Sequence, residues 1–170
     1  MDYKNIIRDV PDYPKPGILF KDITTLWKNP SAFKSSLDEL AENYRKMNIT
    51  KVIGAESRGF IVGAPVAYIL GAGFVPVRKK GKLPAGTISE SYALEYGEAA
   101  LEIHQDAIEP GENILIVDDL LATGGTCEAM IRLIRNLGGN TLGAAFLVEL
   151  EFLHGREKID APVFSLIKYE

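Results

Sequence analysis

One stretch of the sequence, Ile114 to Thr126, constrains the fold of this 170-residue chain more than any other. It begins with four apolar residues, Ile114 to Val117, which is the pattern of a strand buried on both faces of a parallel sheet. Two carboxylates and a glycine turn follow, and then a segment whose apolar residues recur at helical spacing. A strand that runs through a tight turn into a helix is the repeating unit of an α/β protein.

The rest of the chain shows the same alternation of strands and helices. Asn29 and Pro30 predict a helix start, because asparagine caps free N–H groups and proline suits the first helical position. The predicted elements are a helix from Pro30 to about Lys46, a strand at Val52–Ala55, a helix to about Leu70, and strands at Phe74–Val77, Leu142–Leu150 and Val163–Ile167. We therefore predict one α/β domain, residues 1–170, with a mainly parallel central sheet flanked by helices and an N-terminal extension at about residues 1–28.

An insertion at about residues 78–105 interrupts this alternation. The segment from Arg78 to Glu90 has four cations in its first five residues, then proline and glycine, and no helical or strand period. We expect it to form a flexible basic loop. The two runs on either side of Gly97, SYALEY and EAALEIH, predict an antiparallel hairpin.

The overall composition argues against several classes of function. The net charge is −4 and the isoelectric point is near 5.3, so we expect neither nucleic acid nor an anionic membrane as partner. One cysteine excludes an internal disulfide framework, and the N-terminal segment has no apolar run of signal-peptide length. We therefore expect a soluble, cytoplasmic protein. His104 and His154 lie far apart without other ligands at metal spacing, which argues against a zinc site.

The turn that follows the strand at Ile114–Val117 has the features of a phosphate-binding site. Asp118 and Asp119 lie at the carboxyl end of the strand, where open α/β sheets bind ligands. In the run from Ala122 to Thr126, small residues let backbone N–H groups converge on an anion, and the helix N-terminus adds free donors. The turn has no lysine and is not a Walker loop. Two solvated aspartates beside a tight turn are the alternative, but carboxylates at this spacing from ATGGT favour ribose hydroxyls and a divalent metal.

The run VDDLLATGGT resembles the phosphoribosyl diphosphate (PRPP) motif of the type I phosphoribosyltransferases. The resemblance extends over nearly the whole chain, through YPKPGILFKDIT from Tyr13, ESRGF from Glu56, RKKGKLP from Arg78, ALEYG from Ala93 and GREK from Gly155. ALEYG and the GKLP loop are similar to those of the adenine-specific branch. The resemblance implies a purine salvage enzyme that transfers the 5-phosphoribosyl group from PRPP to adenine, giving AMP and diphosphate, with Mg²⁺ as cofactor and as a homodimer.

The same resemblance implies roles for the residues that bind PRPP. Asp118 and Asp119 would hold the ribose hydroxyls, directly and through water on Mg²⁺, which itself would be held mainly through PRPP. Arg58 would neutralise the diphosphate, whereas the turn taken alone favours a helix start with Arg58 in a surface ion pair. The remaining assignments are Ala122, Thr123, Gly124, Gly125 and Thr126 for the 5′-phosphate, and Arg78, Lys79 and Lys82 on the closing loop for the diphosphate.

The resemblance also implies how the base is recognised. Residues 1–28 would form a hood in which Phe20 stacks on adenine and Lys21 belongs to the adenine site, although many relatives carry arginine at this position. Glu95 would be the general acid/base near the purine, and Tyr96 would help to close the site. From the residues alone, a core side chain is an equally good interpretation of Phe20. For Glu95 the residues alone favour an exposed, solvated residue of the hairpin.

Two other functions are compatible with a PRPP motif. The chain could transfer the phosphoribosyl group to another purine or to a pyrimidine, against which the GKLP loop and ALEYG argue. It could also be a non-catalytic regulator that senses PRPP, but such a protein would need a DNA-binding module or a basic recognition helix, and the net charge opposes this reading.

Overall fold

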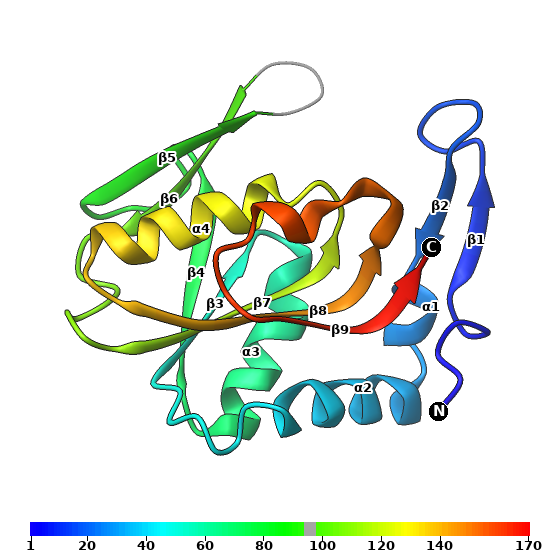
Figure 1. Ribbon diagram of the computed structural model, residues 1–170, viewed down its shortest axis with the longest axis horizontal. Helices are drawn as coiled ribbons and strands as arrows, with labels where there is room; N and C mark the ends of the chain where they lie inside the picture. The colour runs from blue at the N-terminus through cyan, green and yellow to red at the C-terminus, as the bar shows by residue number, and fades with distance from the viewer. Residues whose placement is uncertain (94–97) are drawn as a thin grey trace.

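In the computed structural model of the protein, which describes residues 1–93 and 98–170, a seven-stranded sheet forms the centre of the molecule (Figure 1). Its strand order is β5-β6-β4-β3-β7-β8-β9. The parallel strands are β3 (Lys51–Ala55), β4 (Gly73–Lys79), β7 (Asn113–Leu121), β8 (Asn140–Leu150) and β9 (Val163–Tyr169), and the antiparallel hairpin consists of β5 (Thr87–Ala93) and β6 (Glu98–His104). The predicted fold class, a mainly parallel sheet with a hairpin insertion, is confirmed.

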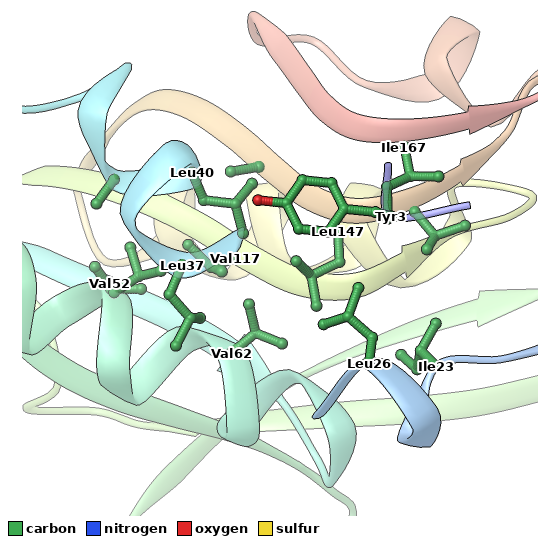
Figure 2. Close-up of a cluster of buried hydrophobic side chains, with 14 of the residues drawn as sticks. Tyr3, Ile23, Leu26, Leu37, Leu40, Val52, Val62, Val117, Leu147 and Ile167 are labelled. Carbon is green, nitrogen blue, oxygen red and sulfur yellow. The ribbon is translucent and has the colours of Figure 1, made fainter. Parts of the chain in front are cut away.

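Helices cover both faces of the sheet. Helices α2 (Pro30–Glu42) and α3 (Arg58–Leu70) lie on one face, and α4 (Gly125–Asn136) lies on the other (Figure 1). The side chains of β7 alternate between the two layers, because successive residues of a strand point to opposite faces. Val117 packs with Leu37 and Val62 in the cluster shown in Figure 2, whereas Ile116 packs with residues of α4.

The start of α2 is as predicted, but its end is not. The Asn29 side chain accepts a hydrogen bond from the Ala32 N–H at 3.1 Å, and Pro30 is the first helical residue. The helix ends at Glu42 rather than near Lys46. Beyond it the chain forms tighter turns, in which the N–H of Tyr44 bonds three residues back, yet Tyr44 remains buried. Tyr44 therefore follows the apolar spacing of the helix although it lies beyond the helix end.

The predicted loop from Arg78 to Glu90 is wrong at both ends. Arg78 and Lys79 are the last residues of β4, and residues 87–90 belong to β5, which leaves 80–86 outside the strands. The charged end of β4 pairs with β6, where Arg78 lies opposite Glu102 and Lys79 opposite Leu101. A run of cations can thus continue a strand when carboxylates face it. The predicted hairpin is confirmed, but its connection, with Glu95 and Tyr96, lies outside the described residues.

The N-terminal extension contains structure that the sequence analysis did not predict. Strands β1 (Arg8–Pro11) and β2 (Leu19–Asp22) form a separate antiparallel pair, and the short helix α1 (Thr24–Trp27) follows. This pair stands beside the C-terminal end of β9 (Figure 1). Within residues 1–93 and 98–170, no helix is both long and apolar enough to cross a lipid bilayer.

Candidate active site

The two aspartates lie within β7 rather than after it. Strand β7 is longer than the four apolar residues predicted, because Asp118 pairs with Phe146 of β8 and the pairing continues to Leu121. The turn then begins at Ala122, and α4 begins at Gly125, within the run from Ala122 to Thr126 that was predicted to open a helix. Gly124 has φ +82°, a left-handed conformation that favours glycine. The strand and the helix together fix the position of both carboxylates and of the turn.

Two adjoining pockets bring most of the predicted residues together. A pocket of about 420 Å³ is lined by Ala55, Glu56, Ser57, Arg58, Gly59, Lys79, Tyr92, Leu101, Asp118, Asp119, Leu120, Ala122 and Thr126. A smaller one of about 80 Å³ lies at the turn itself, where its lining includes Thr123, Gly124 and Gly125. The two pockets share Asp118, Leu120, Ala122 and Thr126. The site therefore runs from the 56–59 turn, past both aspartates, to the 122–126 turn.

The aspartate pair is buried and short of positive charge. Asp118 is 8% exposed and Asp119 is 4% exposed. Burial raises the pKa of Asp118 well above its usual range, and the neighbouring charge of Asp119 raises it further. Burial also raises the pKa of Asp119, while Arg58, whose Nε lies 3.0 Å from Asp119 Oδ2, opposes this. The Asp119 N–H donates to Asp118 Oδ1 at 2.9 Å.

This carboxylate pair suits a divalent cation that has further ligands of its own. Asp119 Oδ2 is buried and, although it forms an ion pair with Arg58, accepts no hydrogen bond from the residues that the structure describes. Two carboxylates with one guanidinium leave a negative balance that a hard cation such as Mg²⁺ would offset. Among the residues that the structure describes, no group of three or more histidine, cysteine, aspartate or glutamate side chains could hold a metal alone. Most ligands of such an ion would therefore come from a bound molecule and water.

The turn between β3 and α3 forms the other wall of the site. Arg58 is the first residue of α3, and its side chain is 43% exposed. The next residue, Gly59, lies directly against the aspartates, since a Cβ on it would be 2.6 Å from Asp118 Oδ1. The N-terminus of a 13-residue helix thus points its free N–H groups and one guanidinium at the pocket. This arrangement can bind an anion beside the carboxylates.

Glu56 lines the site, but the sequence analysis assigned it no role beyond its place in the run ESRGF. Its Oε1 accepts the Lys79 N–H at 2.5 Å, and its Oε2 lies 3.2 Å from Arg78 Nη2. Burial raises the pKa of Glu56, but the hydrogen bonds from Lys79 and Arg78 outweigh it and the net shift is downward. The signal was available in the pairing of β3 with β4, which places Ala55 beside Val77 and hence Glu56 beside Arg78.

Four of the predicted residues that the structure describes do not line the pocket. Arg78 donates to the Lys82 carbonyl at 3.2 Å, and neither residue lines the pocket. Phe20 packs edge-on against Tyr13, with ring centroids 5.1 Å apart, and belongs to neither buried cluster. Lys21 pairs with Asp9 at 2.6 Å and lies over the Tyr169 ring. The structure does not bring Phe20 or Lys21 to the pocket.

Comparisons with known proteins show the family of the chain. Residues 26–170 match the family model described as the phosphoribosyl transferase domain. The adenine phosphoribosyltransferase of Acidobacterium capsulatum is 60% identical over 167 residues, which is 98% of this chain and 92% of the relative. Among solved structures, the adenine phosphoribosyltransferase of Thermoanaerobacter pseudethanolicus has a TM-score of 0.95 at 51% identity and covers 99% of this chain and 98% of its own.

A third relative was solved with ligands. The adenine phosphoribosyltransferase of Saccharomyces cerevisiae, in complex with D-2,5-dideoxy-2,5-imino-altritol 1,6-bisphosphate and adenine, has a TM-score of 0.92 at 43% identity. The match covers 97% of this chain and 96% of the yeast chain. The family model covers most of the sequence, and relatives with the same name match nearly its full length. The chain therefore belongs to the phosphoribosyltransferase family, among its adenine phosphoribosyltransferases.

Proposed function

We propose that the protein is a purine salvage enzyme that transfers the 5-phosphoribosyl group from PRPP to adenine and releases AMP and diphosphate. One observation carries this proposal most directly. The buried pair Asp118 and Asp119 lies between two anion-binding helix starts, at Arg58 and at Gly125, in one continuous site. PRPP has the matching order of groups, a diphosphate, a ribose with two hydroxyls and a 5′-phosphate.

Different residues of the site would bind the three parts of PRPP. The N–H groups and hydroxyls of the 122–126 turn would bind the 5′-phosphate at the start of α4. Asp118 and Asp119 would accept hydrogen bonds from the ribose hydroxyls. Arg58 and Lys79 line the opposite part of the pocket, where they would neutralise the diphosphate.

The reaction breaks the bond between ribose C1 and the diphosphate oxygen and forms a bond from C1 to adenine N9. The bonding electrons leave with diphosphate, so that the ribose gains positive character. The two aspartates would stabilise that charge because they are already fixed and buried beside it. Adenine N9 attacks through its lone pair from the form of the base that carries its ring proton on N7, and we assign the acceptance of that proton to the Glu95 carboxylate.

Mg²⁺ belongs to this proposal as the cofactor. When bound, it would neutralise diphosphate oxygens and thereby improve the leaving group. Asp118 and Asp119 would hold it through water. Asp119 Oδ2, which is ion-paired with Arg58 but accepts no hydrogen bond within the described residues, supports this placement. A homodimer and a cytoplasmic location are further parts of the proposal, as are the roles of Phe20 and Lys21 in adenine binding and of Tyr96 in closure.

The decisive experiment measures AMP formation from adenine and PRPP with Mg²⁺. Hypoxanthine, guanine, xanthine and a pyrimidine base serve as competing substrates, and the variant Asp118→Asn controls for a contaminating enzyme. We expect turnover with adenine and with none of the other bases. Faster turnover of another base would select that alternative, and PRPP binding without turnover of any base would indicate a regulator.

A further inference from the structure

The segment Gly155–Lys158, a 3₁₀ turn that follows β8, has a function in the protein that its sequence does not reveal. Figure 1 shows this orange turn beside the loop between β7 and α4. The two backbones are in direct contact. A Cβ on Gly155 would lie 2.1 Å from the Ala122 carbonyl oxygen and 2.9 Å from the Gly124 nitrogen, and a Cβ on Gly124 would lie 2.3 Å from the Gly155 oxygen. No side chain fits between them.

Space rather than backbone conformation requires glycine at position 155. Gly124 has a positive φ, which by itself favours glycine, but Gly155 does not. Any side chain at Gly155 would therefore displace one of the two backbones, and the turn at Ala122–Gly124 is part of the pocket lining. Gly155 supports the back of the turn without lining the pocket.

Arg156 fixes this support to the central sheet. Its guanidinium makes a two-point contact with Glu149, with Nε 3.0 Å from Oε1 and Nη2 on Oε2. Its Nη1 donates to the Val163 carbonyl at 2.9 Å. Glu149 is 3% exposed near the end of β8, and Val163 is the first residue of β9. A planar guanidinium with two partners on adjacent strands holds the residue before it in a defined place.

The Arg156–Glu149 contact connects the 155–158 segment to the same point of the sheet from which the 122–126 turn starts. Glu149 pairs in register with Leu121, the last residue of β7, after which the turn begins. The chain leaves the sheet at Leu121. Arg156 binds Glu149, the residue that pairs with Leu121, and Gly155 beside it contacts Ala122 and Gly124. The turn and the segment that contacts it are therefore both attached to the paired strands β7 and β8.

We propose that Gly155 and Arg156 are positioning residues that fix the 122–126 turn in the geometry that binds the 5′-phosphate of PRPP. The inference rests on the proposed function only in naming that phosphate. Neither residue touches the substrate. Their effect reaches it through the backbone of the turn, where a displacement of about 1 Å can reduce the rate by about 10²-fold.

The first experiment separates the two ends of the substrate with two probes, ribose 5-phosphate and inorganic diphosphate. We expect Gly155→Ala to weaken ribose 5-phosphate binding by about 10²-fold and to leave diphosphate binding unchanged in calorimetric titrations. Gly73→Ala is the matched control, since its Cβ would lie 3.6 Å from the nearest atom, an ordinary contact. Unchanged ribose 5-phosphate binding, or equal loss of both probes, would overturn the proposal.

The second experiment tests Arg156 without confusing positioning with folding. Arg156→Met alone leaves the buried Glu149 unpaired, which destabilises the protein. The double variant Glu149→Gln/Arg156→Met removes both charges, so we expect it to recover the melting temperature that the single variant loses. We expect its KM for PRPP to remain raised while its KM for adenine does not change. Arg156→Lys, which keeps the charge and loses the planar fork, should give an intermediate KM. A double variant with the wild-type KM for PRPP would refute the role of Arg156.

These tests distinguish the inference from the proposed function. A wild-type protein that binds ribose 5-phosphate and forms no AMP refutes the function, and the effect of Gly155→Ala on binding still decides the inference. An active wild-type protein whose Gly155→Ala variant binds ribose 5-phosphate normally refutes the inference alone.

Discussion

The Arg58 guanidinium lies 3.0 Å from the Asp119 carboxylate, so that the diphosphate side and the ribose side of the candidate site share one ion pair. Asp119 is almost fully buried, whereas the Arg58 side chain is 43% exposed. Arg58 therefore has room to contact a bound anion while it offsets the buried charge beside it. A change at Arg58 should affect both sides of the site to different degrees.

We expect Arg58→Gln to weaken diphosphate binding more than ribose 5-phosphate binding, because only the diphosphate would contact the guanidinium directly. A charge-assisted hydrogen bond contributes about 1.5–3 kcal/mol, which corresponds to roughly tenfold to 10²-fold in affinity. Arg58→Lys should recover part of the loss, since it keeps the charge without the planar fork. Equal weakening of both probes would place Arg58 in a structural role only.

Replacement of Asp118 should separate activity from stability. We expect Asp118→Asn to lower kcat/KM by about 10²-fold or more at saturating Mg²⁺, as for other lost electrostatic contacts in a transition state. The same change removes a buried carboxylate that Asp119 repels, while an amide oxygen can still accept the Asp119 N–H. The melting temperature should therefore stay the same or rise.

Asp119→Asn should cause a comparable loss of activity and serves as the partner measurement. It differs in leaving Arg58 without its carboxylate. Unchanged turnover in either variant would contradict the assigned roles of the two aspartates.

The N-terminal strand pair should contribute an acid-sensitive part of the stability. Hydrogen bonds from Thr24 and then from Arg8 lower the pKa of Asp22 from 3.8 to about 2. A group whose pKa is lowered by folding stabilises the protein above its unfolded pKa, and this contribution is lost as the pH falls through the folded value. We expect Asp22→Asn to reduce the free energy of unfolding by about 1–2 kcal/mol at neutral pH, a figure that allows for the exposure of Arg8.

Urea unfolding at a series of pH values checks this prediction. The difference between wild type and Asp22→Asn should shrink as the pH falls from about 5 to about 2. Lys34→Gln is a control, because the Lys34 pair with Asp38 is exposed on α2 and should contribute little at any pH. A difference that stays constant with pH would show that Asp22 acts through its shape and not its charge.

The central sheet could be predicted from the sequence because its strands carry their own signal. Continuous apolar runs predict β3 and β7, and the glycines after them predict the turns. The strand pair β1–β2 gives no such signal. Its four-residue strands are stabilised by pairs across the strands, with Arg8 opposite Asp22 and Asp9 opposite Lys21. Such a pattern becomes visible only once the register is known.

The site was predictable to the extent that it is built from local turns. The 122–126 turn and the Asp118–Asp119 pair are contiguous in sequence, and their composition indicates their chemistry. Glu56 acquires its role only through the neighbouring strand, which brings Arg78 and Lys79 to it. The same contact explains why this strand end resembled a loop in the sequence: the carboxylate that accepts from the Arg78 guanidinium and from the Lys79 backbone N–H lies 22 and 23 residues away.

Glu95 lies outside the described residues, but the hairpin that carries it is fixed to the helix of the phosphate turn. Arg132 of α4 contacts Glu90 at 3.0 Å and donates to the Ser91 carbonyl at 2.8 Å, so that β5 lies along α4. The connection between β5 and β6 therefore starts from a position set by the same helix that would hold the 5′-phosphate. The role of Glu95 near the base remains a prediction that a substitution tests.

We expect Glu95→Gln to fold, to bind PRPP normally and to lose turnover by about 10²–10⁴-fold, the usual contribution of general acid–base catalysis. Ground-state adenine gains little from proton exchange at N7, so the loss should appear in kcat and not in the KM for adenine. Glu98→Gln, which removes a charge from the same hairpin, is the matched control. A normal kcat with a raised KM for adenine would make Glu95 a binding residue. If neither parameter changes, Glu95 is a solvated hairpin residue and the proton must be exchanged by another group.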